Sequence, residues 1–318
     1  MHVVETMAYA GEKPWHGLGN KLAPQQSIEI WKKQAGMDWQ IEQSEVRYIS
    51  GSDHLGVINA FPEQKVLYRS DTKAPLAVVS KRFHVVQPGE ILEFYRDLTA
   101  GNGFELETAG VLREGRKFWA LAKTGQSTAL KGRDRVDGYL LLATACDGTL
   151  ATTAQFTSVR VVCNNTLSIA LGNASSAIKV PHRSQFDPEA VKRQLGITVT
   201  SWDDFVKRMK ALVDRPLDPD SVDGLLRRVL TYASQDGKAS VVNEQAVAIV
   251  RALYDGGGRG ALMASSRGTA WGLLNGVTEF IDHHRRARSD DHRRDAAWFG
   301  QGAQIKQRAW DEVVKLVV

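Results

Sequence analysis

The stretch from residue 104 to residue 156 constrains the fold most, because its strand-like segments are joined only by turns. Asp147-Gly148 is a strong two-residue hairpin signal between two of them. No strand–helix–strand alternation is present, which makes a doubly wound parallel sheet a poor fit. The predicted strands of this antiparallel meander are 104–112, 117–124, 137–146 and 149–156, with a basic loop at 126–136.

Helices are predicted on both sides of the meander. Pro88 suits the first turn of a helix that runs to about Thr99. After the meander, Thr157 or Ser158 can cap a helix that runs to about Leu171. Three shorter strands are expected earlier, at 46–49, 65–69 and 76–80.

We therefore predict an α+β fold: an antiparallel β-meander packed with helices, with a β-β-β-α core, followed by an all-helical C-terminal region. The predicted boundaries are an irregular N-terminal arm at 1–37, a sheet-and-helix core at 38–184 and a helical region at 185–318. The arm is rich in turn residues and contains Trp15. The helices expected after residue 185 are 187–195, 201–213, 220–233, 243–254, 269–284 and 303–316.

The charge balance permits a nucleic-acid partner without requiring one. Lys and Arg number 41 against 36 Asp and Glu, so the net charge of the 318 residues is +5. The chain has no apolar run of about 18 residues and no apolar leader segment, so we expect a cytoplasmic protein with no membrane partner. The two cysteines, Cys146 and Cys163, are expected to be small buried residues.

The usual catalytic signatures are missing, which predicts a protein that is not an enzyme and needs no cofactor. The glycine-rich loop at 255–260 lacks the Lys-Ser or Lys-Thr of a phosphate-binding loop. No HExxH, paired CxxC or GxSxG motif occurs. The His, Asp and Arg residues of 282–294 leave three interpretations open: a solvated charged loop, a loop that contacts phosphate or a subunit, or a metal site of a nuclease.

Basic residues around the meander suggest single-stranded DNA binding, because Phe83, Phe118, Trp119 and Phe156 are interleaved with them. Cations can follow phosphates while aromatic rings stack on bases. The alternative is that the cations are solvated and the aromatic residues form the core. The candidate DNA-binding residues are Lys81, Arg82, His84, Arg116, Lys117, Lys123, Lys131, Arg133, Arg135, Arg160, Asn164, Asn165, His182 and Arg183.

Arg160 is expected in the first turn of the helix after the meander. A cation there is unfavourable for the helix dipole, which favours a specific partner such as a phosphate or an acidic side chain. Asn164 and Asn165 are poor helix formers and suggest polar contacts in the same region.

Four phrases, at 11–19, 80–88, 159–167 and 298–303, resemble a family of phage and plasmid proteins of unassigned function, domain of unknown function nine-three-two. The resemblance extends over almost the whole chain. It implies no enzymatic residues.

Residues 85–180 also resemble, in the order of their predicted elements, the single-strand annealing recombinases of the Rad-fifty-two type. That resemblance implies a homo-oligomeric ring or filament that binds single-stranded DNA in homologous recombination of a phage, prophage or plasmid, with a phage or host recombination partner. The predicted helix departs from the family's pattern, since it offers Arg160 but no second or third cation. A protein-interaction or anti-defence factor, and a metal-dependent nuclease, are the alternative functions.

Overall fold

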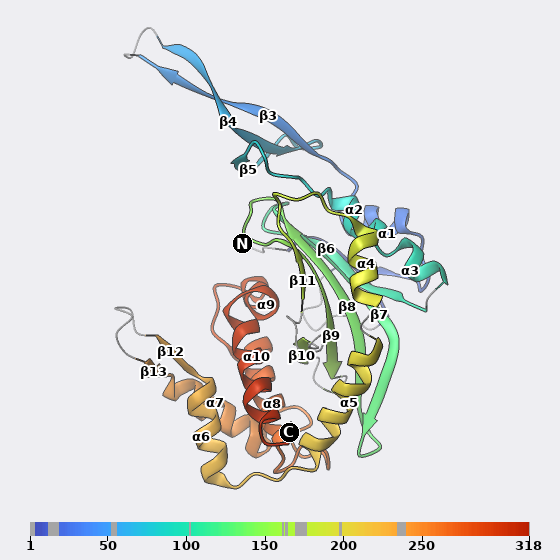
Figure 1. The fold of residues 1–318 in the computed structure, drawn as a ribbon, viewed down its shortest axis with the longest axis vertical. Helices are drawn as coiled ribbons and strands as arrows, with labels where there is room; N and C mark the ends of the chain where they lie inside the picture. The colour runs from blue at the N-terminus through green and yellow to red at the C-terminus, as the bar shows by residue number, and fades with distance from the viewer. Residues whose placement is uncertain are drawn as a thin grey trace. The chain divides into compact units, whose positions relative to one another are not determined.

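The computed structural model describes residues 4–11, 19–51, 56–101, 103–160, 162, 165–168, 177–196, 199–233 and 240–317. The chain forms two compact units (Figure 1). Unit 1 contains Met1–Thr124, Leu140–Gln155 and Ala177–Gly196, and unit 2 contains Gly125–Tyr139, Phe156–Ser176 and Ile197–Val318. The predicted boundaries at 37 and 184 differ from this division, because the middle strands contribute to both units.

The antiparallel meander is confirmed, and its second, third and fourth strands are longer than predicted. The four strands are β6 (Glu105–Leu112), β7 (Lys117–Leu130), β8 (Asp134–Ala145) and β9 (Thr152–Arg160), in the sheet order β10-β9-β8-β7-β6-β1-β2. The prediction of a basic loop at 126–136 is wrong, because most of these residues extend β7 and β8 and only the turn 131–133 separates the two strands. Lys131 and Gly132 make this tight turn with positive φ angles of 44° and 82°.

The N-terminal segment is not the irregular arm that was expected. Strand β1 (Val4–Ala10) pairs antiparallel with β6, and β2 (Asn20–Leu22) pairs parallel with β1. Met7, Ala8 and Tyr9 are buried, so this apolar run completes the sheet rather than lying over it. Helix α1 (Ile28–Gln34) follows with Ser27 as its N-cap, and Trp15 lies outside the described residues.

The helix expected from 158 to 171 is also wrong. Strand β9 continues to Arg160, and β10 (Asn165–Ser168) returns antiparallel along its end. Strand β11 (Ile178–Val180) pairs with the beginning of β9. The run Thr157-Ser158-Val159 contains two β-branched residues, whose strand preference prevails over the capping signal. The described residues of this segment therefore do not form the helix that closes an annealing-type core.

Helices α2 (Pro88–Glu93), α3 (Arg96–Gly101) and α4 (Pro188–Gly196) also belong to unit 1. The single helix predicted at 88–99 is thus divided into two short ones. The Tyr95 hydroxyl between them is buried, 2.9 Å from the Ala120 carbonyl and 3.0 Å from that of Leu140. This hydroxyl ties the helices to strands β7 and β8.

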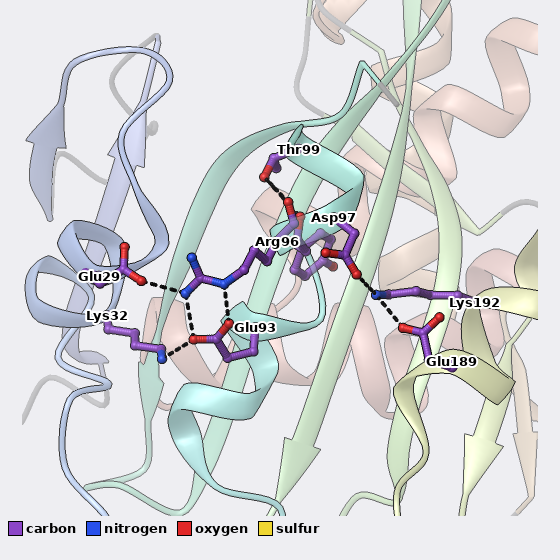
Figure 2. A network of polar contacts seen from close by, with 9 residues as sticks. Glu29, Lys32, Glu93, Arg96, Asp97, Thr99, Glu189 and Lys192 are labelled. Carbon is purple, nitrogen blue, oxygen red and sulfur yellow. Dashed lines mark hydrogen bonds and ion pairs between the residues drawn. The ribbon is translucent and has the colours of Figure 1, made fainter. Parts of the chain in front are cut away.

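Ion pairs join the helices of unit 1 (Figure 2). The Arg96 guanidinium binds Glu93 and Glu29, each with an N–O distance of 2.6 Å. Lys192 of α4 binds Asp97 at 3.1 Å and Glu189 at 2.9 Å. Because these carboxylates are engaged with cations, the network explains helix packing rather than catalysis.

The three early strands are confirmed and form a separate three-stranded sheet. It contains β3 (Ile41–Ser50), β4 (Val57–Arg69) and β5 (Pro75–Ser80), in that order (Figure 1). Strand β5 pairs only with the stretch Gln64–Tyr68 of β4. The outer part of the β3–β4 hairpin is therefore a two-stranded ribbon.

Unit 2 is mostly helical, as predicted, with three differences. The predicted helices correspond to α5 (Val199–Val213), α6 (Pro219–Val229), α7 (Glu244–Ala252), α8 (Ala270–Glu279) and α10 (Gln301–Val314). Helix α9 (Asp290–Phe299) occupies part of the expected charged loop, and wider π-turns at Leu253–Gly257 (η1) and Phe280–His284 (η2) continue α7 and α8. A small hairpin, β12 (Thr231–Ala233) with β13 (Ser240–Val242), interrupts the helices.

The core of unit 2 combines these helices with the ends of the meander strands. Phe205 of α5 and Trp310 of α10 pack with ring centroids 5.0 Å apart. Leu130 and Val136, from β7 and β8, are buried in the same cluster. Within the described residues, no helix is both long and apolar enough to cross a membrane.

Candidate nucleic-acid interface

One surface of unit 1 brings together two of the predicted basic segments, 81–84 and 182–183. The Phe83 ring stacks on the His182 imidazole with centroids 4.2 Å apart and an interplanar angle of 17°. The His84 backbone N–H donates to the His182 carbonyl at 2.6 Å. These contacts hold the two segments side by side, although 98 residues separate His84 from His182 along the chain.

The His182 ring is fixed at both of its nitrogens. Nε2 lies 2.9 Å from the Leu150 carbonyl oxygen, and Nδ1 lies 3.2 Å from the His84 carbonyl oxygen. Lys65 Nζ donates to the Phe83 carbonyl at 2.7 Å, and partial burial lowers the pKa of Lys65. The stacked pair is therefore held on a rigid support.

The basic residues beside this stack are exposed. They are Lys81, Arg82, His84 and Arg183, and within the described residues none of them forms an ion pair with a carboxylate. We call these four residues, with Phe83 and His182, the Phe83–His182 surface. Because Phe83 is only half-buried, the surface offers both charge and an aromatic ring, the combination that single-stranded nucleic acid requires.

The turn between β6 and β7 lies beside the turn between β8 and β9, because the Cys146 N–H donates to the Arg116 carbonyl at 2.9 Å. The Arg116 side chain is half-buried, and its Nε has no hydrogen-bond partner within the described residues. Lys117 is only 3% exposed, so the expectation that it contacts DNA is corrected. Burial raises the pKa of the Cys146 thiol to about 12, which agrees with its predicted role as a buried residue.

The other predicted cations do not join this surface. Lys123 pairs with Glu107 at 3.1 Å. Lys131 and Arg135 belong to unit 2, where they pair with Asp214 at 2.5 Å and with Asp137 at 2.7 Å. Arg133 is exposed in the turn between them. These ion pairs neutralise three of the cations that were expected to bind DNA.

Arg160 is the clearest correction among the site residues. Its side chain is 2% exposed and pairs with Asp134 inside unit 2, so an acidic residue, and not a phosphate, is its partner. Asn165 lies in β10, where its backbone is the register partner of Arg160. Asn164 lies outside the described residues.

A metal site was one of the three interpretations of 282–294, and the described side chains, which do not include those of Asp290 and Asp291, show no arrangement that favours it. No group of three or more His, Cys, Asp or Glu residues converges there. Asp282 pairs with Lys306 at 2.7 Å, and His292 Nδ1 lies 2.9 Å from the hydroxyl of Ser289. This hydroxyl also accepts from the His292 backbone N–H and so caps helix α9.

A second surface of unit 1 was missed by the sequence interpretation. We call residues 45–50 and 57–63 the hairpin tip. On one of its faces Ile49 and Ile58 are directly opposite each other, 73% and 65% exposed. On the other face Tyr48, Val57 and Phe61 are also exposed. The alternating pattern of β3 was visible in the sequence, but nothing indicated that both faces lack a covering layer.

The fold and these surfaces define a mixed α+β protein with a basic, aromatic surface on its sheet unit. The chain belongs to the family described as a domain of unknown function (DUF932), which matches residues 75–298. This match confirms the family resemblance seen in the sequence. No curated protein and no solved structure is significantly similar to the chain.

Proposed function

We propose that this protein is a cytoplasmic, homo-oligomeric single-stranded DNA-binding protein that anneals complementary strands in homologous recombination of a mobile element, without nucleotide hydrolysis. The observation that carries the proposal is the Phe83–His182 surface, where the exposed cations Lys81, Arg82 and Arg183, with the exposed His84, flank a stacked aromatic pair. Lys81, Arg82 and Arg183 would hold phosphates. The accessible part of Phe83 would stack on a base, a contact worth about 1–3 kcal/mol.

Annealing follows from binding of this kind if the strand is held by its backbone. A strand fixed at its phosphates leaves most of its bases free to pair with a complementary strand. Because the described surface is small, each copy would hold only a few nucleotides, and a long strand requires several copies. Self-association is therefore part of the proposal.

The hairpin tip is the surface that favours self-association. Isolated two-stranded hairpins are marginally stable in water, so a tip with apolar pairs on both faces needs a partner. Strand β3 pairs only with β4 and leaves one edge open within the described part of the chain. The tip contains Glu45, Glu63 and Arg47, so its net charge is −1, which is a small repulsion between two copies.

We propose that the occupant is the β3 strand of a second copy, paired antiparallel about a twofold axis. With Val46 on the axis, Glu45 lies opposite the partner's Arg47, and Arg47 lies opposite the partner's Glu45. A shift that puts residue 45 or residue 47 on the axis would place like charges opposite each other, which is destabilising. Among the registers centred on residues 45 to 47, the one centred on Val46 is therefore the one that pairs opposite charges, and a foreign protein on the tip is the alternative outcome.

DNA binding is tested by fluorescence anisotropy of the full chain with a labelled single-stranded oligonucleotide. About three phosphate contacts predict a slope near −2 in log affinity against log salt, or roughly 20-fold weaker binding at 200 mM than at 50 mM salt. The variant Lys81→Gln/Arg82→Gln/Arg183→Gln should lose this slope. Lys207→Gln, which removes a 77% exposed lysine of α5, is the matched control and should bind like the wild type.

Three outcomes would overturn the proposal: no binding at low salt, equal affinity for duplex and single strand, or unchanged binding by the triple variant. Annealing is measured separately, as the rate at which two labelled complementary oligonucleotides pair in the presence of the protein. If binding is found without faster pairing, the annealing part of the proposal fails and single-strand binding remains.

A further inference from the structure

A polar cavity in unit 2 shares no residue with the Phe83–His182 surface or the hairpin tip. It has a volume of about 460 Å³ and is formed by β12, α7, η2 and α10. Cavities that bind small molecules are typically about 300–1,000 Å³. The cavity is therefore large enough for more than a single inorganic ion.

The lining of this cavity is basic. Arg285, Arg286, Arg308 and His284 face it, and no Asp or Glu is among the described residues that line it. Glu279, whose Oε1 lies 3.7 Å from His284 Nε2, is itself buried and accepts the Arg259 backbone N–H. The remaining lining combines side-chain amides with an apolar wall that includes Ile249, Phe280 and Ile305.

Arg285 is the residue whose environment indicates a missing partner. Its Nη2 donates to Gln301 Oε1, while Nη1 is buried and has no hydrogen-bond partner within the described residues. Burial lowers the pKa of the Arg285 guanidinium, and no described carboxylate pairs with it to offset that effect. The guanidinium is half-buried and one of its nitrogens is unsatisfied, and an anion bound beside it would offset that cost.

Arg308 is held so that it can assist Arg285. Its Nη1 donates to the carbonyls of Val229 and Thr231, at 3.1 and 2.7 Å, which fixes the guanidinium beside β12. These two contacts use only one of its nitrogens, so further N–H groups remain to bind an anion. Arginine is well suited to this task, because its planar fork matches the oxygens of a phosphate.

We propose that this cavity binds a nucleoside phosphate, with the phosphate on Arg285 and Arg308 and the base against the wall of Phe280, Ile249 and Ile305. The amides of Gln245, Gln301 and Gln304 would hydrogen-bond the sugar or the edge of the base. The phosphate can come from a free nucleotide or from the 5′ end of a DNA strand, since both present the same group. This binding is separate from the Phe83–His182 surface and does not depend on it.

The test is isothermal titration of the full chain with adenosine monophosphate, adenosine and inorganic phosphate. Adenosine monophosphate should bind at least tenfold more tightly than either fragment. Arg285→Gln should weaken the binding of adenosine monophosphate at least tenfold, and Arg308→Gln should weaken it by as much. Because Arg308 is exposed, its replacement should preserve the fold, so the test can still be made if Arg285→Gln does not fold. Arg288→Gln, at an exposed arginine outside the cavity, is the matched control and should bind normally.

Competition by a 5′-phosphorylated oligonucleotide, but not by its unphosphorylated form, would assign the phosphate to a DNA end. No competition would assign the site to free nucleotides. The proposal is overturned if adenosine monophosphate does not bind at millimolar concentration, or if correctly folded Arg285→Gln and Arg308→Gln both bind it as the wild type does. The triple variant of the Phe83–His182 surface should retain nucleotide binding, so failure of one site is distinguishable from failure of the other.

Discussion

Arg160 and Asp134 form a two-point ion pair inside unit 2, with Nε–Oδ1 and Nη2–Oδ2 distances of 2.7 Å each. Asp134 Oδ2 also accepts from the Ser265 hydroxyl at 2.6 Å and from Trp271 Nε1 at 3.1 Å. The pair thus connects the beginning of β8, the end of β9 and the loop before α8. The sequence argument for a partner of Arg160 assumed the first turn of a helix, which is wrong, since Arg160 ends strand β9 and its partner Asp134 begins strand β8.

Removing one member of this pair should strongly destabilise the protein. Asp134→Ala leaves a buried guanidinium without a counter-charge, and we expect a loss of about 3–5 kcal/mol in the free energy of unfolding. Asp134→Leu/Arg160→Met removes both charges and should recover much of that loss. Urea unfolding followed by tryptophan fluorescence measures these variants together with the single substitutions Asp134→Leu and Arg160→Met, and a double variant that loses the sum of the two single effects would contradict this account.

The ion pairs of Arg96 with Glu29 and Glu93 predict that the stability of the fold depends on pH in the acid range. Arg96 is the largest cause of the lowered pKa of Glu29 and of Glu93, each to about 2 from an ordinary value of 4.5. A carboxylate with a lowered pKa stabilises the fold above its unfolded pKa, and this contribution is lost as the pH falls from about 4.5 to about 2. The Tm of Arg96→Gln should therefore lie below that of the wild type at pH 6, and the gap should close near pH 2. A gap that stays constant with pH would show that the ion pairs do not contribute.

Much of the fold could be predicted from the sequence, because its signals are local. Alternating strands and the Asp147-Gly148 turn specify the meander, and apolar spacing specifies α5 and α10. The end of β9 was predicted to be the start of a helix, because Thr157 and Ser158 suit a helix cap as well as a strand. Only pairing with β10 decides between the two.

The residues of the candidate site could be named from the sequence, but which of them are exposed and lie together could not. The cations were visible, but their exposure depends on partners distant in the sequence. Arg160 is buried by contact with Asp134 and with Ser266, whose hydroxyl lies 2.6 Å from Nη2. Phe83 and His182 come together only in the fold. Arg308 reaches the cavity beside Arg285 from a helix that the charged segment 282–294 does not include.

Two helical glycines should respond oppositely to replacement by alanine. A Cβ at Gly272 would lie 1.9 Å from the Ser266 carbonyl oxygen, whereas at Gly224 the nearest atom is the flexible end of Arg228 at 3.5 Å. We expect Gly272→Ala to lower the free energy of unfolding by about 3 kcal/mol, near the upper end of overpacking effects. Gly224→Ala should raise it by about 0.5–1 kcal/mol, because alanine favours a helix interior. Thermal unfolding of both variants checks the pair, and equal shifts would contradict it.

Charge exchange on the hairpin tip tests the proposed register of self-association. Glu45→Arg places two arginines opposite each other across the twofold axis and should shift the oligomer toward the monomer, while Glu45→Arg/Arg47→Glu restores opposite charges and should restore the oligomer. Within one copy, Arg47 Nη2 lies 3.1 Å from Glu45 Oε2, and the double exchange preserves that contact as well. Sedimentation velocity at several protein concentrations measures the oligomeric state of each variant.

The apolar pairs of the hairpin tip distinguish pairing at the edge from packing of a face. Ile49→Ser/Ile58→Ser removes two exposed side chains from a face that pairing along the β3 edge leaves uncovered, so the variant should associate like the wild type, and a strong loss of association would show that the face forms the interface. Val78→Ser, at a 55% exposed position on β5, is the matched control because it lies outside the tip. If the wild-type chain is a monomer at all concentrations, self-pairing is wrong and the tip binds a different protein. If it associates but the charge exchange has no effect, the register with Val46 on the axis is wrong.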